Sequence, residues 1–283
     1  MTEEEDDENK KKMLALFISL IRSMGYADSR EEALYQLAEL RTEIAVNRAL
    51  YGFNDMDPEE ALELIRETDT DGLSEEDQEK RARLIAAIDN LIEFATCEEY
   101  HVYKDVEELG EDYSREDWAD EDLEDPLSPF LVINKKYNET YANVEDSDIE
   151  YCMAMAYAWI KWGNDVTLMY MTQNDERVRP WHYDLQGFTA KKDDFPAWMI
   201  PPIEWACRCY LVVEDGVSAK LDLNLLAKKD VPERPKELDG VFKESVCKCG
   251  RIFSDEHPYF QIDDKDEDML NKIVERLRLK YYG

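Results

Sequence analysis

The stretch TQNDERVRPWHYDLQGFTAKKDDFPAWMIPPIEWACRC, residues 172–209, gathers aromatic, basic and cysteine residues in one part of the chain. It follows DVTLMYMTQ, whose β-branched and large apolar side chains predict a strand, and it runs into CRCYLVVEDG, which predicts a second strand. Pro180 suits the first turn of a helix and Gly187 suits its exit, so PWHYDLQ is expected to form about two helical turns. This order predicts a small, mostly antiparallel sheet that carries a short helix.

The first hundred residues show helical periodicity throughout. Apolar residues recur at spacings of three and four between Met13 and Met24, which predicts one buried stripe. Three further helices are predicted to start near Ser29, Pro58 and Ser74, each at a residue type that favours a helix N-terminus.

Two more helices are expected later in the chain. DSDIEYCMAMAYAWIKWG is apolar around much of its circumference, which predicts a deeply buried helix that ends at Gly163. DKDEDMLNKIVERLRLKYYG reads as one amphipathic helix. We therefore predict an α+β protein with four segments: an acidic helical region over 1–104, an acidic linker over 105–129, a sheet-containing domain over 130–260 and a C-terminal amphipathic helix over 261–283.

Composition and charge restrict the function. The 283 residues include 34 Lys and Arg against 67 Asp and Glu, a formal charge of −33. Phosphate binding depends on Lys and Arg, so this balance argues against a surface that binds nucleic acid. It suits solubility, a basic partner, or a crowded compartment in which the chain must not adhere to DNA. No apolar run is long enough to span a membrane, and the acidic N-terminus is unlike a secretory signal. The six cysteines are therefore expected to be thiols or metal ligands in a reducing cytosol.

The segment DERVRPWHYDLQG allows two interpretations. Asp175 could pair with Arg177 or Arg179 and pin the loop before the short helix, with His182 on an adjoining face. This structural interpretation makes the group a buried, ion-paired clasp. The alternative is an Asp-Arg-His cluster for acid–base chemistry or anion binding. With one histidine and no nucleophile in register, the clasp is favoured and no catalytic residue is assigned.

The cysteine pairs form a second candidate site. If Cys207 and Cys209 lie in a strand, their side chains share a face and can reach one ion. Cys247 and Cys249 could then complete a tetrahedral four-cysteine zinc site with Cys207 and Cys209, or His182 or His257 could replace one of these cysteines. Paired zinc cysteines are more often separated by two or more residues, and unligated cysteines are commonly buried. A structural zinc and a set of buried thiols both remain open, and no other cofactor is expected.

The order of these residues resembles the signature of the phage Mu F-like minor head proteins, the head morphogenesis family encoded beside phage portal proteins. The matching positions are Thr172, Asp175, Val178, Arg179, His182, Leu185, Gly187, Pro201, Pro202, Cys207, Arg208 and Cys209. FKESVCKCGRIFSDEHPYF is similar to a tail segment of some members, although its Cys-Lys-Cys departs from the family pattern. The resemblance covers about residues 130–260.

The resemblance implies a low-copy virion protein, made in the bacterial cytoplasm, that lies at the portal vertex or inside the head. It implies the portal protein and the major capsid protein as partners, with packaged DNA nearby but not bound, and no membrane. The expected clasp comprises Thr172, Asp175, Arg177, Arg179, His182, Gly187 and Arg208. Two alternatives are kept: a cargo protein ejected with the genome, and a hydrolase or nuclease that uses the Asp-Arg-His cluster.

Overall fold

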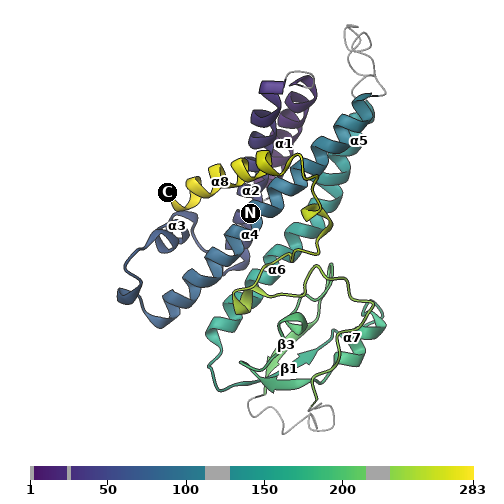
Figure 1. Cartoon of the computed structure of the whole chain (residues 1–283). Coiled ribbons are helices and arrows are strands. Elements are labelled where there is room, and N and C mark those ends of the chain that lie inside the picture. Colours follow the sequence, from purple (N-terminus) through teal and green to yellow (C-terminus); the bar gives the residue numbers. More distant parts are fainter. Residues whose placement is uncertain (1–2, 24–26, 112–127, 215–229) are drawn as a thin grey trace. The chain divides into compact units, whose positions relative to one another are not determined.

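The computed structural model describes residues 3–23, 27–111, 128–214 and 230–283. The chain divides into two compact units, each assembled from separated stretches. Unit 1 comprises Met1–Arg48, Ile88–Asp146 and Pro258–Gly283, and unit 2 comprises Ala49–Ala87 and Ser147–His257. Helices together with a small antiparallel sheet make this an α+β protein, as the sequence predicts (Figure 1).

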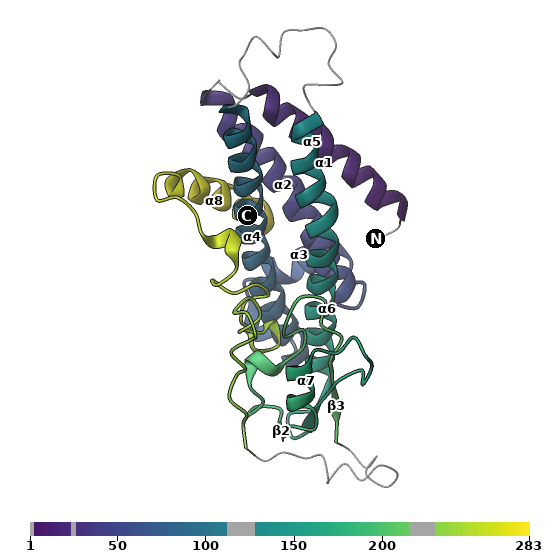
Figure 2. The ribbon, with the colours of Figure 1, turned by 90° about the vertical axis from the view of Figure 1, so that its right-hand side faces the viewer.

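Unit 1 is built from helices. These are α1 (Glu3–Ser23), α5 (Ser128–Lys135), α8 (Glu267–Tyr282) and parts of α2 (Ala27–Gly52), α4 (Glu75–Glu111) and α6 (Ala142–Lys161). The predicted apolar stripes of the first and last helices are confirmed, since Phe17, Leu20 and Leu277 are fully buried. In unit 1, α4 lies beside both α2 and the helical stretch that begins with α5 (Figure 2). Apolar burial between these helices supplies the main driving force for folding this unit.

Three helix N-termini are predicted from residue types that favour a helix start, and two of the three predictions are confirmed. The Asp57 side chain accepts hydrogen bonds from two backbone N–H groups at the start of α3 (Pro58–Arg66), and Ser74 Oγ accepts from Asp77 N at 3.1 Å at the start of α4. The prediction for α2 is wrong by three residues, because the helix begins at Ala27 rather than directly after Ser29.

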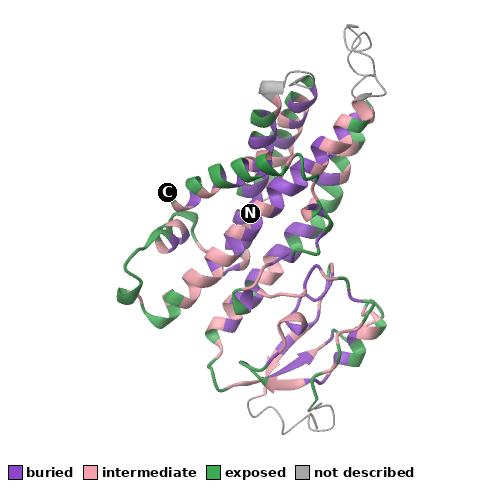
Figure 3. Ribbon diagram, in the orientation of Figure 1, coloured by how far each residue is buried: buried purple, intermediate pink, exposed green. Residues whose placement is uncertain are grey.

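The acidic stretch over 105–129 is helical at its beginning. α4 continues to Glu111, so residues 105–111 belong to it, and residues 112–127 lie outside the described part of the chain. A helical stretch then runs from Ser128 through a π-helical turn (Lys136–Tyr141) into α6. The sequence pattern predicts only the later part of this stretch, from Asp146 onward. Figure 3 shows how burial changes along α4, from an exposed N-terminal end to a buried middle.

A buried ionic cluster lies between the helices of unit 1. The Arg41 guanidinium donates to Glu98 Oε2 at 2.6 Å, to Asp146 Oδ1 at 2.7 Å and to Glu145 Oε2 at 3.2 Å. We call these four residues the Arg41 cluster. All four are buried, and Glu99 beside them is buried with neither carboxylate oxygen hydrogen-bonded to any described residue. The cluster therefore holds more acid than base.

Unit 2 contains the sheet, in the order β2-β1-β3 with both pairings antiparallel. The central strand β1 (Thr167–Met171) is confirmed at the position the sequence predicts, and its three middle residues are completely buried. The edge strands are β2 (Thr189–Lys191), which the sequence analysis does not find, and β3 (Tyr210–Val213). Figure 1 shows β1 and β3 side by side, with α7 (Pro180–Leu185) in the same unit.

Aromatic side chains complete the interior of unit 2. Trp205 packs against Phe242 and Phe253, with ring centroids 5.2 and 5.5 Å apart, and His257 stands edge-on to the same indole. These contacts tie the segment after β3 to the Cys-Arg-Cys region. His257 is thus surrounded by aromatic rings, in a core position.

Candidate functional site

The short helix at the centre of the signature is confirmed. α7 has Pro180 as its first residue, and the chain leaves it through Gly187, whose φ of 82° lies in the left-handed region that glycine adopts without strain. His182 and Leu185, three positions apart, form the buried face of the helix. Pro180 and Gly187 set the ends of this helix, whereas the burial of His182, which the sequence predicts on an adjoining face, is decided by packing.

One edge of the His182 ring is held by a carboxylate. Its Nε2 lies 2.7 Å from Glu204 Oε2, and Trp181 Nε1 donates to the same oxygen at 3.0 Å. Arg179 Nε lies 3.4 Å from that oxygen, while its Nη2 donates to the Trp205 carbonyl at 2.8 Å. Because Glu204 is an acceptor, it fixes the Nε2–H tautomer and turns Nδ1 the other way.

The other edge of the ring faces two sulfur atoms. His182 Nδ1 lies 3.1 Å from Cys209 Sγ and 3.8 Å from Cys207 Sγ. The three side chains are buried, and they are the group of described residues whose His, Cys, Asp or Glu ligand atoms lie within 4.8 Å of one another. We call His182, Cys207, Cys209 and the supporting Glu204 the His182 cluster.

The two thiols come together for a different reason from the one the sequence suggests. β3 begins at Tyr210, so neither cysteine belongs to the strand, and the prediction of alternate strand positions is wrong. They sit instead in a turn where Ala206 has a φ of 54° and donates its backbone N–H to the Asp148 carboxylate at 2.9 Å. An unusual backbone conformation, anchored by a buried acid, brings the sulfurs to one side.

The two sulfur atoms shift each other's pKa in opposite directions. The Cys209 S–H donates to Cys207 and, against the cost of burial, holds the pKa of Cys207 well below its usual range, with His182 adding to the effect. The same hydrogen bond and burial raise the pKa of Cys209. Burial alone would lower the pKa of His182, but its contacts with Cys207 and Glu204 raise it. A thiol, an imidazole and a carboxylate in this order can activate a nucleophile or bind a metal.

Asp175 belongs to a separate, outer ion pair. It receives two hydrogen bonds from Arg208, at 2.8 and 2.9 Å, and its backbone carbonyl accepts from the Tyr183 hydroxyl at 2.8 Å. The structure thus pairs Asp175 with Arg208 rather than with Arg177 or Arg179, and it shows Glu204 as the carboxylate at His182. The predicted clasp divides into a buried inner part and an exposed outer part. The Thr172 hydroxyl, just after β1, donates a hydrogen bond to the Gln186 side chain, just after α7. This bond links the segment before α7 to the segment after it.

The second cysteine pair does not join the first. Cys247 is completely buried in a short turn, where burial raises its pKa to about 12. Cys249 is exposed and accepts a hydrogen bond from Arg83 at 3.3 Å. Both residues are described, and neither lies in the group formed around His182. Among the described residues, the structure brings His182 beside Cys207 and Cys209 and does not bring Cys247 and Cys249 into the same group.

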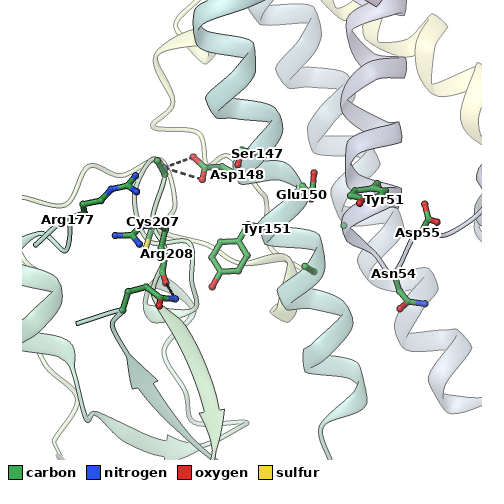
Figure 4. Close-up of a pocket in the computed structure, with 14 residues that line it drawn as sticks. Tyr51, Asn54, Asp55, Ser147, Asp148, Glu150, Tyr151, Arg177, Cys207 and Arg208 are labelled. Carbon is green, nitrogen blue, oxygen red and sulfur yellow. Dashed lines mark hydrogen bonds between the residues drawn. The ribbon is translucent and has the colours of Figure 1, made fainter. Parts of the chain in front are cut away.

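A pocket of about 930 Å³ opens beside the Cys-Arg-Cys turn. Figure 4 shows its wall, with Tyr51 and Asn54 at the end of α2, Asp148 and Tyr151 on α6, and Cys207 opposite them. In this wall the end of α2 packs closely against α6, because a Cβ on Gly52 would lie 2.1 Å from the carbonyl oxygen of Glu150. The pocket gives solvent a route toward Cys207.

Asp148 is the buried acid among the residues that line this pocket. Burial, only partly offset by the Ala206 N–H, raises the pKa of Asp148 to about 7. Sequence reasoning misses both Asp148 and Glu204. Glu204 could have been noticed as the one acid between Pro-Pro and Cys-Arg-Cys, whereas Asp148 lies in the acidic run EDSDIE and carries no distinguishing signal.

A comparison with known protein families finds a match. Residues 116–212 match the family model described as phage Mu protein F like protein. The segment that holds α7, β1 and the Cys-Arg-Cys turn is therefore similar to the phage Mu F-like family, which confirms the predicted resemblance over these residues. Neither the curated proteins nor the solved structures contain a match.

Among the residues that the structure describes, no helix combines the length and the apolar character needed to cross a bilayer.

Proposed function

We propose that this chain is a minor head protein of a bacteriophage, bound at the portal vertex or at the inner face of the capsid, and that it acts in head assembly. The family match over residues 116–212 carries this proposal. The matched segment makes up about a third of the chain, and it includes every residue of the His182 cluster.

The geometry of unit 2 agrees with a structural role. Nearly all the polar contacts of His182 and Glu204 are made inside the protein, and both side chains are buried. Groups that are satisfied internally serve mainly to hold the loops around α7. Such a rigid domain is suited to docking on a partner subunit.

The charge of the chain supports the choice of partners. At −33 it is complementary to a basic face of a portal or capsid subunit, and it disfavours adhesion to the packaged DNA. Charges at the rim of such an interface chiefly set the encounter rate and the specificity.

Exposed apolar residues indicate where a partner would dock. Leu131 and Val132 on α5, and Tyr141 and Val144 just beyond it, are large apolar side chains that are exposed. All four lie in the matched segment and in one helical stretch of unit 1. We propose that this stretch contacts the portal.

The test is binding of the purified full-length chain to the assembled portal protein, measured by co-sedimentation at low and at moderate salt. We expect binding that weakens as salt screens the charges. Val132→Asp should reduce binding, whereas Leu279→Asp, at an equally exposed position of α8 outside the match, should not. Absence of binding to both portal and capsid protein at every salt concentration would contradict the proposal.

A further inference from the structure

We propose that His182, Cys207 and Cys209 bind a zinc ion in the interior of unit 2, through Nδ1 of the histidine and the two sulfur atoms. The inference rests on the positions of these three atoms and on what supports them. It is independent of the proposed role in head assembly.

The spacing of the three atoms suits tetrahedral zinc. With Zn–S bonds of about 2.3 Å and Zn–N bonds of about 2.0 Å, neighbouring ligand atoms in a tetrahedron lie about 3.5 Å apart. The two nitrogen–sulfur distances here are 3.1 and 3.8 Å, on either side of that value. An ion can therefore enter with side-chain shifts of a few tenths of an ångström.

The surroundings of His182 are those of a metal-bound histidine. Zinc-ligating histidines usually donate their second N–H to a carboxylate, which fixes the ring and raises its basicity. Glu204 occupies that position at 2.7 Å, and Trp181 holds Glu204 in turn. These supporting contacts are made by the protein itself, so they hold the ring in the orientation that the ion needs.

The second thiol favours a metal over a cysteine nucleophile. A nucleophile needs one sulfur at the imidazole, yet Cys209 lies closer to Nδ1 than Cys207 does. Zinc balances two thiolates in a buried site, and the protons of the thiols leave when it binds. Two sulfurs beside one imidazole nitrogen are therefore explained by metal coordination, whereas a nucleophilic mechanism would leave the second sulfur without a role.

Solvent fills the fourth coordination position in this proposal. No fourth His, Cys, Asp or Glu among the described residues joins the group, and Cys207 lines the 930 Å³ pocket. Water from that pocket can reach the ion on the side of Cys207. A site with three protein ligands and one water is a known zinc arrangement.

The first experiment measures zinc in the full-length chain, purified under reducing conditions and incubated with zinc before removal of the excess. About one ion per chain is expected for the wild type, and a large loss is expected for Cys209→Ser and for His182→Gln. Cys249→Ser is the matched control, because Cys249 is exposed and lies outside the group, and it should retain the ion. Equal zinc in the wild type and both ligand variants would overturn the proposal.

Cobalt provides a second measurement that needs no variant to fold. The wild type, stripped by a chelator and loaded with Co²⁺, should show sulfur-to-cobalt charge-transfer absorption and tetrahedral d–d bands. Alkylation of Cys207 and Cys209 should be slow with the ion bound and fast after chelation. A protein that takes up neither ion, and whose Cys207 is alkylated quickly or found in a disulfide with Cys209, would contradict the proposal.

Discussion

Two buried polar clusters, one in each unit, differ in the ratio of carboxylates to the donors that contact them. In the Arg41 cluster one guanidinium faces three carboxylates, and burial raises the pKa of Glu98 even beside that cation. In the His182 cluster a single carboxylate oxygen is contacted by three nitrogen donors. The first cluster has an excess of acid, whereas the second surrounds one carboxylate oxygen with three donors and places two sulfurs at the other edge of the imidazole.

Buried polar groups therefore do not all contribute to stability in the same way. A buried ion pair costs much desolvation, so its presence is weak evidence of a stabilising role, but removing one partner is strongly destabilising. The Arg41 cluster should therefore respond most to loss of its cation and to pH. The His182 cluster should respond more moderately to mutation and more strongly to a metal.

The largest effect is expected from Arg41→Met. The change leaves buried carboxylates without their cation and should lower the free energy of unfolding by about 3–5 kcal/mol, as measured by urea denaturation at neutral pH. Lys12→Met, which removes an exposed pair with Glu8, is the control and should leave the midpoint unchanged. Equal midpoints for the two variants would show that the cluster is not charged when buried.

A pH-dependent effect is expected from Glu99→Gln. Burial first, and then the charge of Glu98, raise the pKa of Glu99 well above its usual range. Its contribution to stability is therefore fully present below the ordinary pKa and is lost as pH rises toward the folded value. While only the unfolded chain is ionised, the variant should gain about 1.4 kcal/mol over the wild type per pH unit.

The measurement for Glu99 is a series of urea titrations from pH 4 to pH 8 on both proteins. The two curves should meet near pH 4 and separate above it, with the variant more stable. Parallel curves over the whole range would mean that Glu99 has an ordinary pKa in the folded protein.

A moderate effect is expected from His182→Ala in chelator. The variant removes one donor from buried Glu204, which keeps Trp181 and Arg179, so the cost should be about 1–3 kcal/mol. Chemical denaturation followed by tryptophan fluorescence measures it. A wild-type midpoint would refute the view that the inner part of the clasp stabilises unit 2.

The smallest effect is expected from Arg208→Ala. Its pair with Asp175 is more than a third exposed on both sides, and exposed pairs contribute little. Thermal melting should match that of the wild type within error. A large drop would mean that the outer part of the clasp, and not His182, holds the loop.

The sequence predicts one of these clusters far better than the other. The residues around His182 lie within 27 positions of it, and Pro180 and Gly187 fix the helix that carries it, so local rules predict that helix. The role of Glu204 and the turn at Ala206 escape such rules, because a left-handed non-glycine residue depends on its tertiary partner Asp148.

The Arg41 cluster could not be predicted at all. Arg41 bonds to residues 57 and 105 positions away, and helix periodicity does not say which helices meet. Glu98 and Glu99 stand in TCEEY, where two adjacent acids indicate a solvated face. The π-helical turn before α6 is likewise set by packing rather than by any local pattern, which explains why the early part of that helical stretch is missed.

The measurement that tests the account most directly is the protein inventory of purified phage heads, with copy numbers from quantitative mass spectrometry. A minor head protein should be present in a few copies, in line with the portal rather than the major capsid protein. Many copies that leave with the genome would favour the cargo alternative, and a head that lacks the chain altogether would contradict the proposed function.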